Sequence, residues 1–258
     1  MIGAIAGDII GSVFEHDPIK TTKFPLFTGS SRFTDDTVLS VAIADAILNQ
    51  TDYGAALKNY GRRYPVAGYG LSFLRWAQSS DTKPYNSWGN GSAMRVSPVG
   101  FAFDSTEDVL RQAEKSAAAT HDHPEGIKGA QATALAIFLA RKGADKSEIR
   151  RQIQHRFQYN LDRSTDDIRP FYVFDVSCQG SVPESILAFL DSEDFEDAVR
   201  LAISLGGDSD TMGCIAGGIA QAYYSRIPQK IIAPVKQRLP ETFVHLVDQC
   251  NATFGVSF

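Results

Sequence analysis

The sequence predicts an all-α protein built as one compact multi-helix domain. Apolar residues recur with a period near 3.6 along most of the chain, and no run of alternating polar and apolar residues is convincing as a strand. The 258 residues, 43% of them hydrophobic, are enough to bury a sizeable core, and we expect residues 1–258 to form a single domain. Small residues at helical spacing near both ends predict closely packed central helices.

The first helical segment carries a row of glycines. In the apolar run that opens the chain, Gly3, Gly7 and Gly11 lie four residues apart, which in a helix makes one ridge free of side chains. Glu15 falls next on that row. A carboxylate would therefore be carried wherever the ridge docks.

A second helix with small residues is expected at 212–224, and it is the natural partner for this ridge. Two such helices approach closely because little side-chain volume separates them. Their docking would bring Glu15 toward Asp208 and Asp210.

The other helices follow from the same periodicity and from helix-breaking residues at their ends. Residues 19–32 are expected to be a loop, and residues 156–180 are the least regular part of the chain. The remaining helices are predicted at 38–48, 53–63, 71–78, 106–119, 125–142, 145–155, 183–190, 193–205, 229–238 and 241–251.

Two clusters of acidic and hydroxyl side chains stand at predicted helix starts. Asp208-Ser209-Asp210-Thr211 precedes the helix at 212–224, and Thr34-Asp35-Asp36-Thr37 precedes the helix at 38–48. A helix start needs only one side-chain oxygen to cap a free N–H, so each cluster offers more oxygen than capping can use. Separate caps on separate helices would not explain adjacent acids twice. We therefore expect the clusters to form two halves of one cation site.

The ligand types in these clusters predict hard divalent ions. Gathered within a few ångströms, several carboxylates would repel one another and take up protons in a low-dielectric pocket. Cations remove this conflict, and carboxylate and hydroxyl ligands without His or Cys favour Mg²⁺ or Mn²⁺. This many acids suits two Mg²⁺ or two Mn²⁺ ions bridged by a shared aspartate.

Charge and composition exclude several classes of protein. The net charge is −5 and the Lys and Arg residues are scattered, so no nucleic-acid-binding surface is expected. Three distant cysteines argue against a disulfide framework and against a thiolate zinc site, and they favour a cytoplasmic protein. The apolar run at 2–13 is too short to span a bilayer and carries Asp8, so no membrane segment is expected.

Three further patterns are less specific. The glycine-rich segment 86–95 is typical either of an ordinary loop or of a backbone cradle for phosphate. His121 and His123 suggest zinc, but no third ligand has recognisable spacing, so structural or substrate-contacting roles are favoured. A third acidic cluster, Ser164-Thr165-Asp166-Asp167, is followed by Arg169-Pro170 and is expected to be a solvated loop.

A set of motifs spreads across nearly the whole chain: Gly7-Asp8-Ile9-Ile10-Gly11-Ser12 with Glu15, Thr34-Asp35-Asp36-Thr37, Gly68-Tyr69-Gly70, Gly89-Asn90-Gly91-Ser92-Ala93-Met94-Arg95, Thr120-His121, Ser181-Val182-Pro183 and Gly206-Gly207-Asp208-Ser209-Asp210-Thr211. In this order and spacing, they resemble the ADP-ribosylglycohydrolase family, which includes the dinitrogenase reductase-activating glycohydrolase. The resemblance implies an all-α domain with a dinuclear magnesium or manganese centre at the bottom of a cleft. It also implies removal of ADP-ribose from modified side chains or small acceptors.

The resemblance implies roles for individual residues as well. One ion would be held by Thr34, Asp35 and Asp36, and the other by Asp208 and Thr211, with Asp210 bridging the two. Glu15 matches the family's glutamate beside the metals. The diphosphate and ribose would be lined by Gly68, Tyr69, Gly70, Ser87, Trp88, Gly89, Asn90 and Gly91, and the sugar would be contacted by His121.

We hypothesise metal-assisted hydrolysis at the anomeric carbon of the distal ribose, which releases ADP-ribose from a modified protein or small molecule. The ions would orient the ribose hydroxyls and activate a water molecule, while Glu15, Asp35 or Asp210 would handle the proton. Two rival functions remain open: an ADP-ribose-binding relative without catalysis, and a two-metal phosphoesterase acting on a nucleotide diphosphate. The sequence leaves undetermined the acceptor, the choice between Mg²⁺ and Mn²⁺, and the oligomeric state.

Overall fold

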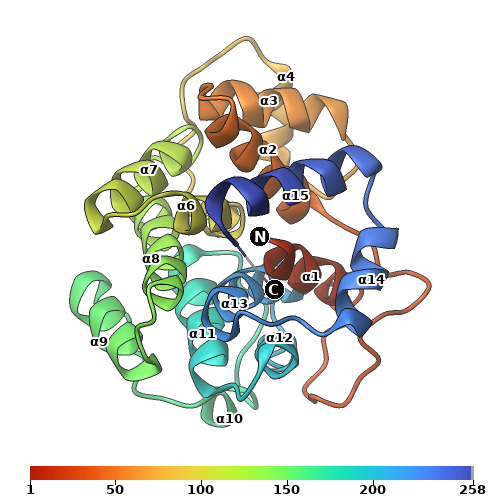
Figure 1. Ribbon diagram of the computed structural model, residues 1–258, viewed down its shortest axis with the longest axis vertical. Coiled ribbons are helices and arrows are strands. Elements are labelled where there is room, and N and C mark those ends of the chain that lie inside the picture. The colour runs from red at the N-terminus through yellow and green to blue at the C-terminus, as the bar shows by residue number, and fades with distance from the viewer. Residues whose placement is uncertain (257–258) are drawn as a thin grey trace.

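The computed structural model describes residues 1–256, and within that range it contains fifteen α-helices and no strand. Gly89 and Ser177 form an isolated bridge. The prediction of a single all-α domain is therefore confirmed (Figure 1), although its expected end at residue 258 lies outside the described residues. No helix within residues 1–256 is both long and apolar enough to cross a membrane.

The helices have bounds close to those predicted from periodicity. The first eight are α1 (Ile2–Gly11), α2 (Asp35–Leu48), α3 (Tyr53–Arg63), α4 (Leu71–Gln78), α5 (Gly91–Met94), α6 (Ser97–Ala102), α7 (Thr106–Ala118) and α8 (Pro124–Arg141). The others are α9 (Lys146–Phe157), α10 (Thr165–Ile168), α11 (Cys178–Asp191), α12 (Phe195–Ser204), α13 (Ser209–Tyr224), α14 (Gln229–Gln237) and α15 (Glu241–Phe254). The short helices α5, α6 and α10 had not been predicted.

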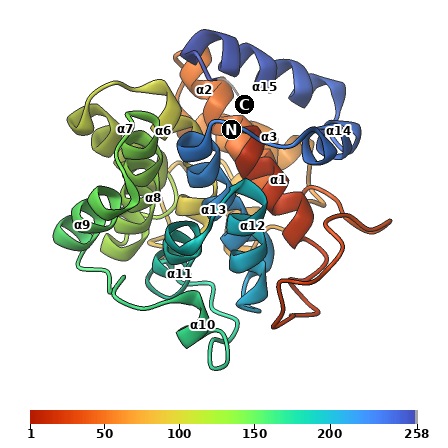
Figure 2. The same ribbon diagram turned by 60° about the horizontal axis from the view of Figure 1, so that its bottom comes forward.

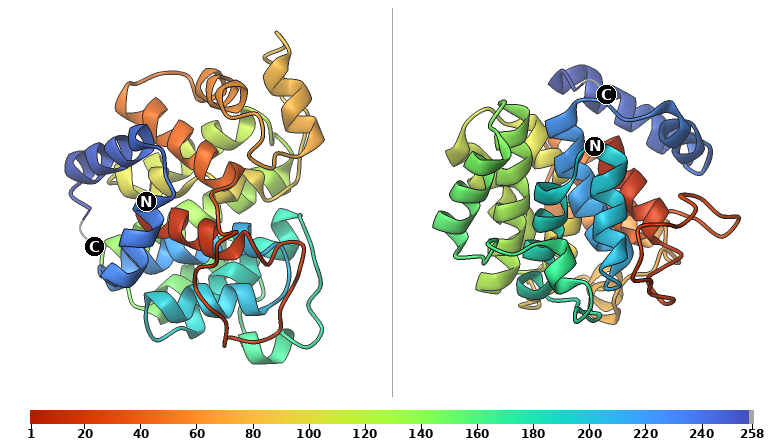
Figure 3. Two further views of the ribbon diagram at one scale, coloured as in Figure 1. Left: turned by 90° about the vertical axis from the view of Figure 1, so that its right-hand side faces the viewer. Right: turned by 90° about the horizontal axis from the view of Figure 1, so that it is seen from below.

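Helices α1 and α13 form the buried centre of the fold. They lie side by side in the middle of Figure 1, and the rotated view in Figure 2 keeps them adjacent. Every residue of α1 is buried, and so is every residue of α13 except the last two. Helices α2, α8, α11 and α12 pack around this pair, while α14 packs on α1 and α15 on α2. Figure 3 also shows the long loop, residues 12–34, that leaves α1 and returns to α2.

Side-chain caps set many helix starts. Asp52 accepts a hydrogen bond from the backbone N–H of Ala55 at 2.8 Å, and Asp194 accepts one from that of Asp197 at the same distance. Each bond satisfies one of the free N–H groups that a helix start leaves. These single-oxygen caps are the ordinary case with which the acid-rich starts of α2 and α13 contrast.

Helix α1 is shorter than the glycine row suggested, and this corrects one prediction. It ends at Gly11, so Glu15 does not lie on a helical row with the glycines. The hydroxyl of Ser12 donates to the carbonyl of Ile9 at 2.9 Å, and Phe14 beyond it packs edge-on against Phe24 with ring centroids 5.0 Å apart. This packing turns the chain out of the helix. Glu15 is therefore carried by a loop.

The segment expected to be irregular, residues 156–180, holds two helix starts. The third acidic cluster was predicted to be a loop, but it forms the single turn of α10, with a capping box between Ser164 and Asp167. Helix α11 begins at Cys178, several residues before Pro183, which had been expected to lie at the start of the helix. Pro183 lies inside α11, beyond its first turn, where the missing N–H leaves out one backbone hydrogen bond of the helix.

Candidate active site

The close approach of α1 and α13 depends on glycine. A Cβ on Gly7 would lie 1.9 Å from the carbonyl oxygen of Gly213, and one on Gly3 would lie 2.5 Å from that of Gly217. Cβ atoms do not come so close to other atoms, so no side chain fits at these positions. The predicted docking of the two small-residue helices is confirmed, and it places the start of α13 beside the loop that carries Glu15.

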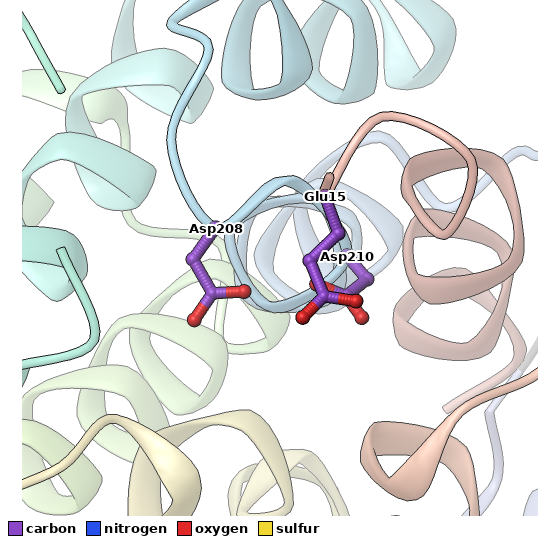
Figure 4. Close-up of side chains that lie close together, drawn as sticks. All are labelled: Glu15, Asp208 and Asp210. Carbon is purple, nitrogen blue, oxygen red and sulfur yellow. The ribbon is translucent and has the colours of Figure 1, made fainter. Parts of the chain in front are cut away.

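Three carboxylates gather at the start of α13. One oxygen from each of Glu15, Asp208 and Asp210 lies within 4.8 Å of the other two. Figure 4 shows that Asp208 and Asp210 come from the beginning of α13 and Glu15 from the loop after α1, and that all three side chains point to the same side. The cluster could hold a metal ion, because hard divalent cations prefer carboxylate oxygens.

The acidic start of α2 meets this cluster. Thr34 caps α2 by accepting a hydrogen bond from the backbone N–H of Asp36 at 3.3 Å. The hydroxyl of Thr211 donates to Oδ2 of Asp36 at 3.4 Å, which joins α13 to α2. Oδ1 of Asp36 is buried and has no hydrogen-bond partner within the described chain. Two segments that are far apart in sequence thus lie together, and one of their buried carboxylate oxygens is unpaired.

Asp8 supports this meeting of helices, although sequence analysis assigned it no role. Fully buried in α1, it accepts hydrogen bonds from the backbone N–H of Thr34 at 3.0 Å and from the Thr34 hydroxyl at 2.8 Å. It accepts two more from the backbone N–H of Thr37 at 3.1 Å and from the Thr37 hydroxyl. These bonds tie α1 to the first turn of α2. The available signal was an aspartate inside an apolar run, a residue type that is buried only when it is well paired.

Burial and mutual repulsion raise the pKa values of these acids. Burial first, and then the charge of Asp210, raises the pKa of Asp8 to about 7. The same two causes raise the pKa of Glu15 and, well above their usual range, those of Asp35, Asp36 and Asp208. The cluster therefore favours protons or other cations over the ionised, unpaired state.

The acidic cluster lines a cavity of about 480 Å³, within the range of sites for small molecules. Neither Lys nor Arg is found among the described residues that line it. A larger open groove of about 1120 Å³ runs along α3 and α7, but Asp52 is the only carboxylate in its described lining. The carboxylates that could hold a cation are thus in the smaller cavity.

Most of the residues predicted to contact substrate lie at this cavity. Its lining includes Gly68, Gly70, Ser87, Gly89, Asn90, Gly91 and His121, together with Glu15, Asp35, Asp36, Asp208, Asp210 and Thr211. Three predicted residues are not in the lining. Tyr69 is buried and stacks on Phe73 with ring centroids 4.9 Å apart, Trp88 is 48% exposed, and Thr34 lies among Asp8 and Asp36.

The cavity also has walls that sequence analysis did not identify. They are formed by Leu39, Leu71, Ser72, Phe73, Tyr85, Met94, Phe174 and Val176. Phe174 and Val176 come from residues 156–180, which the sequence showed as the least regular part of the chain. Single apolar residues in a loop carry no usable signal, because only their neighbours in space distinguish a cavity wall from core or surface.

The glycine-rich segment is held in place from two sides. The side-chain amide of Asn90 donates to Oδ2 of Asp208 at 2.8 Å, which links the segment to α13. The backbone N–H of Asn90 donates to the carbonyl of Val176 at 2.8 Å, and that of Cys178 donates to the carbonyl of Trp88 at 3.0 Å. The segment is therefore a fixed wall of the cavity, and its last residues form α5 instead of a loop.

The two histidines have separate environments. His121 is buried at the cavity, with Nδ1 2.7 Å from the Thr120 hydroxyl, and burial together with the charge of Arg95 holds its pKa well below the usual range. His123 caps α8, because its Nδ1 accepts a hydrogen bond from the backbone N–H of Glu125 at 3.1 Å. The second histidine is thus occupied as a cap, which further disfavours zinc.

Comparisons with known proteins agree with the fold and with the order of the motifs. The family model for ADP-ribosylglycohydrolase matches residues 1–256. ADP-ribosylhydrolase ARH3 from Homo sapiens is 27% identical, in a match that covers 87% of this chain and 84% of the relative. ADP-ribosylarginine hydrolase Tri1 from Pseudomonas putida (strain GB-1) is 26% identical, in a match that covers 87% of this chain and 69% of the relative. A solved ADP-ribosylglycohydrolase-related protein complex has a TM-score of 0.76 at 24% identity and covers 100% of this chain and 96% of its own, so it supports the fold alone.

Proposed function

The chain belongs to the ADP-ribosylglycohydrolase family, and from this premise we propose that it is a metal-dependent hydrolase that cleaves the glycosidic bond between ADP-ribose and an acceptor. One observation carries the proposal. The acidic starts of α2 and α13 meet at one cavity, where Thr211 donates to Asp36 at 3.4 Å. Hydrolysis by a simple pair of carboxylates would not need this many acids in one place.

The residues of the cavity fit a pair of hard divalent ions, either Mg²⁺ or Mn²⁺. All candidate ligands offer oxygen, and Oδ1 of Asp36 is buried without a partner among the described residues. Burial and repulsion between neighbouring carboxylates raise the pKa values of these acids, and bound cations would relieve that repulsion. We assign one ion to Thr34, Asp35 and Asp36 and the other to Asp208 and Thr211, with Asp210 shared between them.

When bound, such ions supply Lewis acidity, which lowers the pKa of water and favours binding of sugar hydroxyls. We assign proton transfer to Glu15, because it lines the cavity beside Asp210, and burial together with the charge of Asp210 raises its pKa. Asp35 and Asp210, which also line the cavity, are the other candidates. As the water oxygen attacks the anomeric carbon, the bond to the acceptor breaks, and the proton taken by the base is available to the departing acceptor atom.

The neutral wall of the cavity is the proposed site for the diphosphate and ribose. Gly68, Gly70 and the segment from Ser87 to Gly91 present backbone groups with little side-chain bulk. Tyr69 and Trp88 lie within these two segments in sequence but outside the cavity lining, and His121 lies against Gly91. Backbone donors suit an anionic ligand here, since the cavity lining includes no basic side chain among the described residues.

The acceptor class stays open between an ADP-ribosylated protein and a small molecule. The relatives named for ADP-ribosyl and for ADP-ribosylarginine hydrolysis are 27% and 26% identical to this chain, so identity does not choose between them. A panel of arginine-linked, serine-linked and small-molecule acceptors should therefore be compared.

We also place the protein in the cytoplasm. Cys178, Cys214 and Cys250 are free and buried, which is the usual state of cysteines in a reducing compartment. Fractionation of the source cells, followed by immunodetection, would test this assignment.

The proposed activity is tested by incubating the protein with the acceptor panel, with Mg²⁺, with Mn²⁺ and with EDTA, and identifying products by mass spectrometry. Release of intact ADP-ribose that EDTA abolishes would support the proposal. AMP with ribose phosphate would indicate a phosphoesterase instead. Binding of ADP-ribose without release from any acceptor would indicate a non-catalytic relative.

A further inference from the structure

A guanidinium group lies buried behind the glycine-rich wall of the cavity. Arg95, the residue directly after α5, is 0% exposed. Its Nη2 donates to the carbonyl of Ser116 at 2.9 Å and to the hydroxyl of Thr120 at 2.8 Å. Nε and Nη1 have no partner, and Arg95 forms no ion pair within residues 1–256. A buried cation without a counter-ion destabilises a fold, so packing alone does not account for it.

The hydroxyl of Thr120 connects this cation to the cavity. Its hydrogen-bond partners are Nη2 of Arg95, which can only donate, and Nδ1 of His121 at 2.7 Å. Because the guanidinium occupies a lone pair of the hydroxyl oxygen, the hydroxyl proton is free for Nδ1. The Tyr85 hydroxyl is the other group close to the Thr120 hydroxyl; burial raises the pKa of Tyr85, and hydrogen bonding with Thr120 lowers it. Nδ1 of His121 and the Tyr85 oxygen are therefore the two acceptors within reach of the hydroxyl proton. A hydroxyl polarised by a cation is also a stronger donor.

When the Thr120 hydroxyl donates to Nδ1, the ring N–H of His121 is on Nε2, the nitrogen nearer the glycine-rich wall. Nε2 lies 3.2 Å from the position of a Cβ on Gly91 and 3.7 Å from that of a Cβ on Gly89. His121 is 5% exposed and lines the cavity. Burial and the charge of Arg95 lower the pKa of His121, which keeps the ring neutral. The ring is therefore a fixed, uncharged hydrogen-bond donor at the wall.

We propose that Arg95 and Thr120 are positioning residues that lock His121 in the Nε2–H tautomer, so that it donates a hydrogen bond to an oxygen of bound ADP-ribose. The ligand rests on the proposed function, whereas the tautomer does not. The cavity presents five carboxyl groups, from Glu15, Asp35, Asp36, Asp208 and Asp210. A positively charged donor would pair with these carboxylates in competition with the metal ions. A neutral donor does not, and it still gives an anionic ligand one hydrogen bond.

The tautomer is read directly by long-range ¹H–¹⁵N NMR on protein labelled at its five histidines, with His121 identified from the spectrum of His121→Gln. The wild type should show a protonated Nε2 and an unprotonated Nδ1. Thr120→Val removes the hydroxyl at nearly constant volume and should produce a mixture of tautomers, whereas Thr120→Ser should keep the wild-type pattern. A wild-type ring that is protonated at Nδ1, or a Thr120→Val spectrum identical to the wild type, would overturn the proposed locking of the His121 tautomer by Arg95 and Thr120.

Calorimetry with ADP-ribose and Mg²⁺ tests the ligand contact. Loss of one hydrogen bond should weaken binding about tenfold in Thr120→Val, while Thr120→Ser stays close to the wild type. His121→Gln keeps an amide donor near the position of Nε2 and should bind better than His121→Asn, whose amide is shorter. Equal binding by all four variants would overturn the contact. A wild type that binds no ADP-ribose would overturn the proposed function. The NMR experiment on the free protein would still test whether Arg95 and Thr120 lock the His121 tautomer.

Discussion

The chain carries paired aspartates next to hydroxyl residues at the start of α2 and again at the start of α10, with opposite electrostatic outcomes. At α10, Asp167 accepts hydrogen bonds from the backbone N–H and the hydroxyl of Ser164 at 3.0 and 2.7 Å, and these bonds lower its pKa. At α2, burial and the neighbouring charge of Asp210 raise the pKa of Asp36 well above its usual range.

The difference comes from the surroundings of each cluster. The α10 cluster lies at the surface, where the side chain of Asp166 is 82% exposed and paired with Arg169. The α2 cluster lies against the glycine-packed helices α1 and α13, which bring further acids to it. The local pattern specifies only a helix cap. The residues that surround it in space make the α2 cluster, and not the α10 cluster, a candidate metal site.

The largest difference between the two clusters should appear in catalysis. We expect Asp36→Ala and Asp210→Ala to lower kcat/KM by on the order of a thousandfold or more, because each removes a proposed metal ligand. Asp166→Ala is the matched control and should stay within about twofold of the wild type. ADP-ribose release at saturating Mg²⁺ measures the effect, and circular dichroism checks the helices. Undiminished turnover in Asp210→Ala would rule out the bridging role.

The pH dependence of stability in metal-free protein should have opposite signs at the two clusters. The pKa of Asp8 rises from 3.8 to about 7 in the folded protein. The folded state therefore binds more protons than the unfolded chain between these values, and its stability falls as the pH rises through that window, by on the order of a few kcal/mol. The pKa of Asp167 is lowered in the folded protein. Its contribution to the stability of the folded state is therefore lost only as the pH falls through and below the usual aspartate range.

Urea unfolding of EDTA-treated protein at about pH 5 and about pH 8 tests this contrast. Asp8→Asn should reduce the loss of unfolding free energy between the two pH values. Asp167→Asn should leave that difference unchanged. The same loss in Asp8→Asn and the wild type would show that Asp8 ionises normally.

The packing that brings the α2 cluster to α13 should be sensitive to a single methyl group. Gly7→Ala should destabilise the protein by about 3 kcal/mol or more, because its Cβ would lie 1.9 Å from the carbonyl oxygen of Gly213. Gly29→Ala is the control, since a Cβ there meets nothing within 4 Å. Denaturant midpoints give both values, and equal midpoints would mean that the two helices do not depend on this contact.

Metal ions should stabilise the protein through the α2 cluster and not through the α10 cluster. At about a hundredfold its Kd, Mg²⁺ or Mn²⁺ should raise the free energy of unfolding by about 2.7 kcal/mol. The effect should grow as the pH rises from about 5 to about 8, because protons compete for carboxyl groups with raised pKa values. Thermal unfolding with and without EDTA measures it. Asp36→Asn should reduce the stabilisation by metal ions and Asp166→Asn should retain it, and the reverse pattern would place the ions elsewhere.

The smallest expected effect belongs to the cap of α10. Ser164→Ala removes one half of the capping box and should lower the free energy of unfolding by about 1 kcal/mol. Turnover should stay unchanged, because the cluster lies outside the cavity lining. A large loss of activity in this variant would give the third cluster a role that its exposure does not explain.

Local patterns predicted much of the secondary structure. The bounds of α3 and α4 agree with the predicted ranges 53–63 and 71–78, since their apolar periodicity and end signals lie within the helices themselves. The errors lie where a contact with another segment decides the local structure. Helix α1 stops at Gly11 as Phe14 packs on Phe24, and yet Glu15 still reaches Asp210, carried by a loop instead of a helical row.

The sequence by itself determined the helices, the glycine rows that let two of them dock, and the oxygen chemistry of the candidate ligands. These features depend on residues close together in the chain. The sequence also predicted that the acidic clusters of α2 and α13 meet. Tertiary structure alone decided the contacts by which they meet, how Asp8 ties α1 to α2, and that Phe174 and Val176 wall the cavity. The reason is that burial, pKa and cavity shape depend on neighbours in space, and the same residues in water would be ordinary caps and loops.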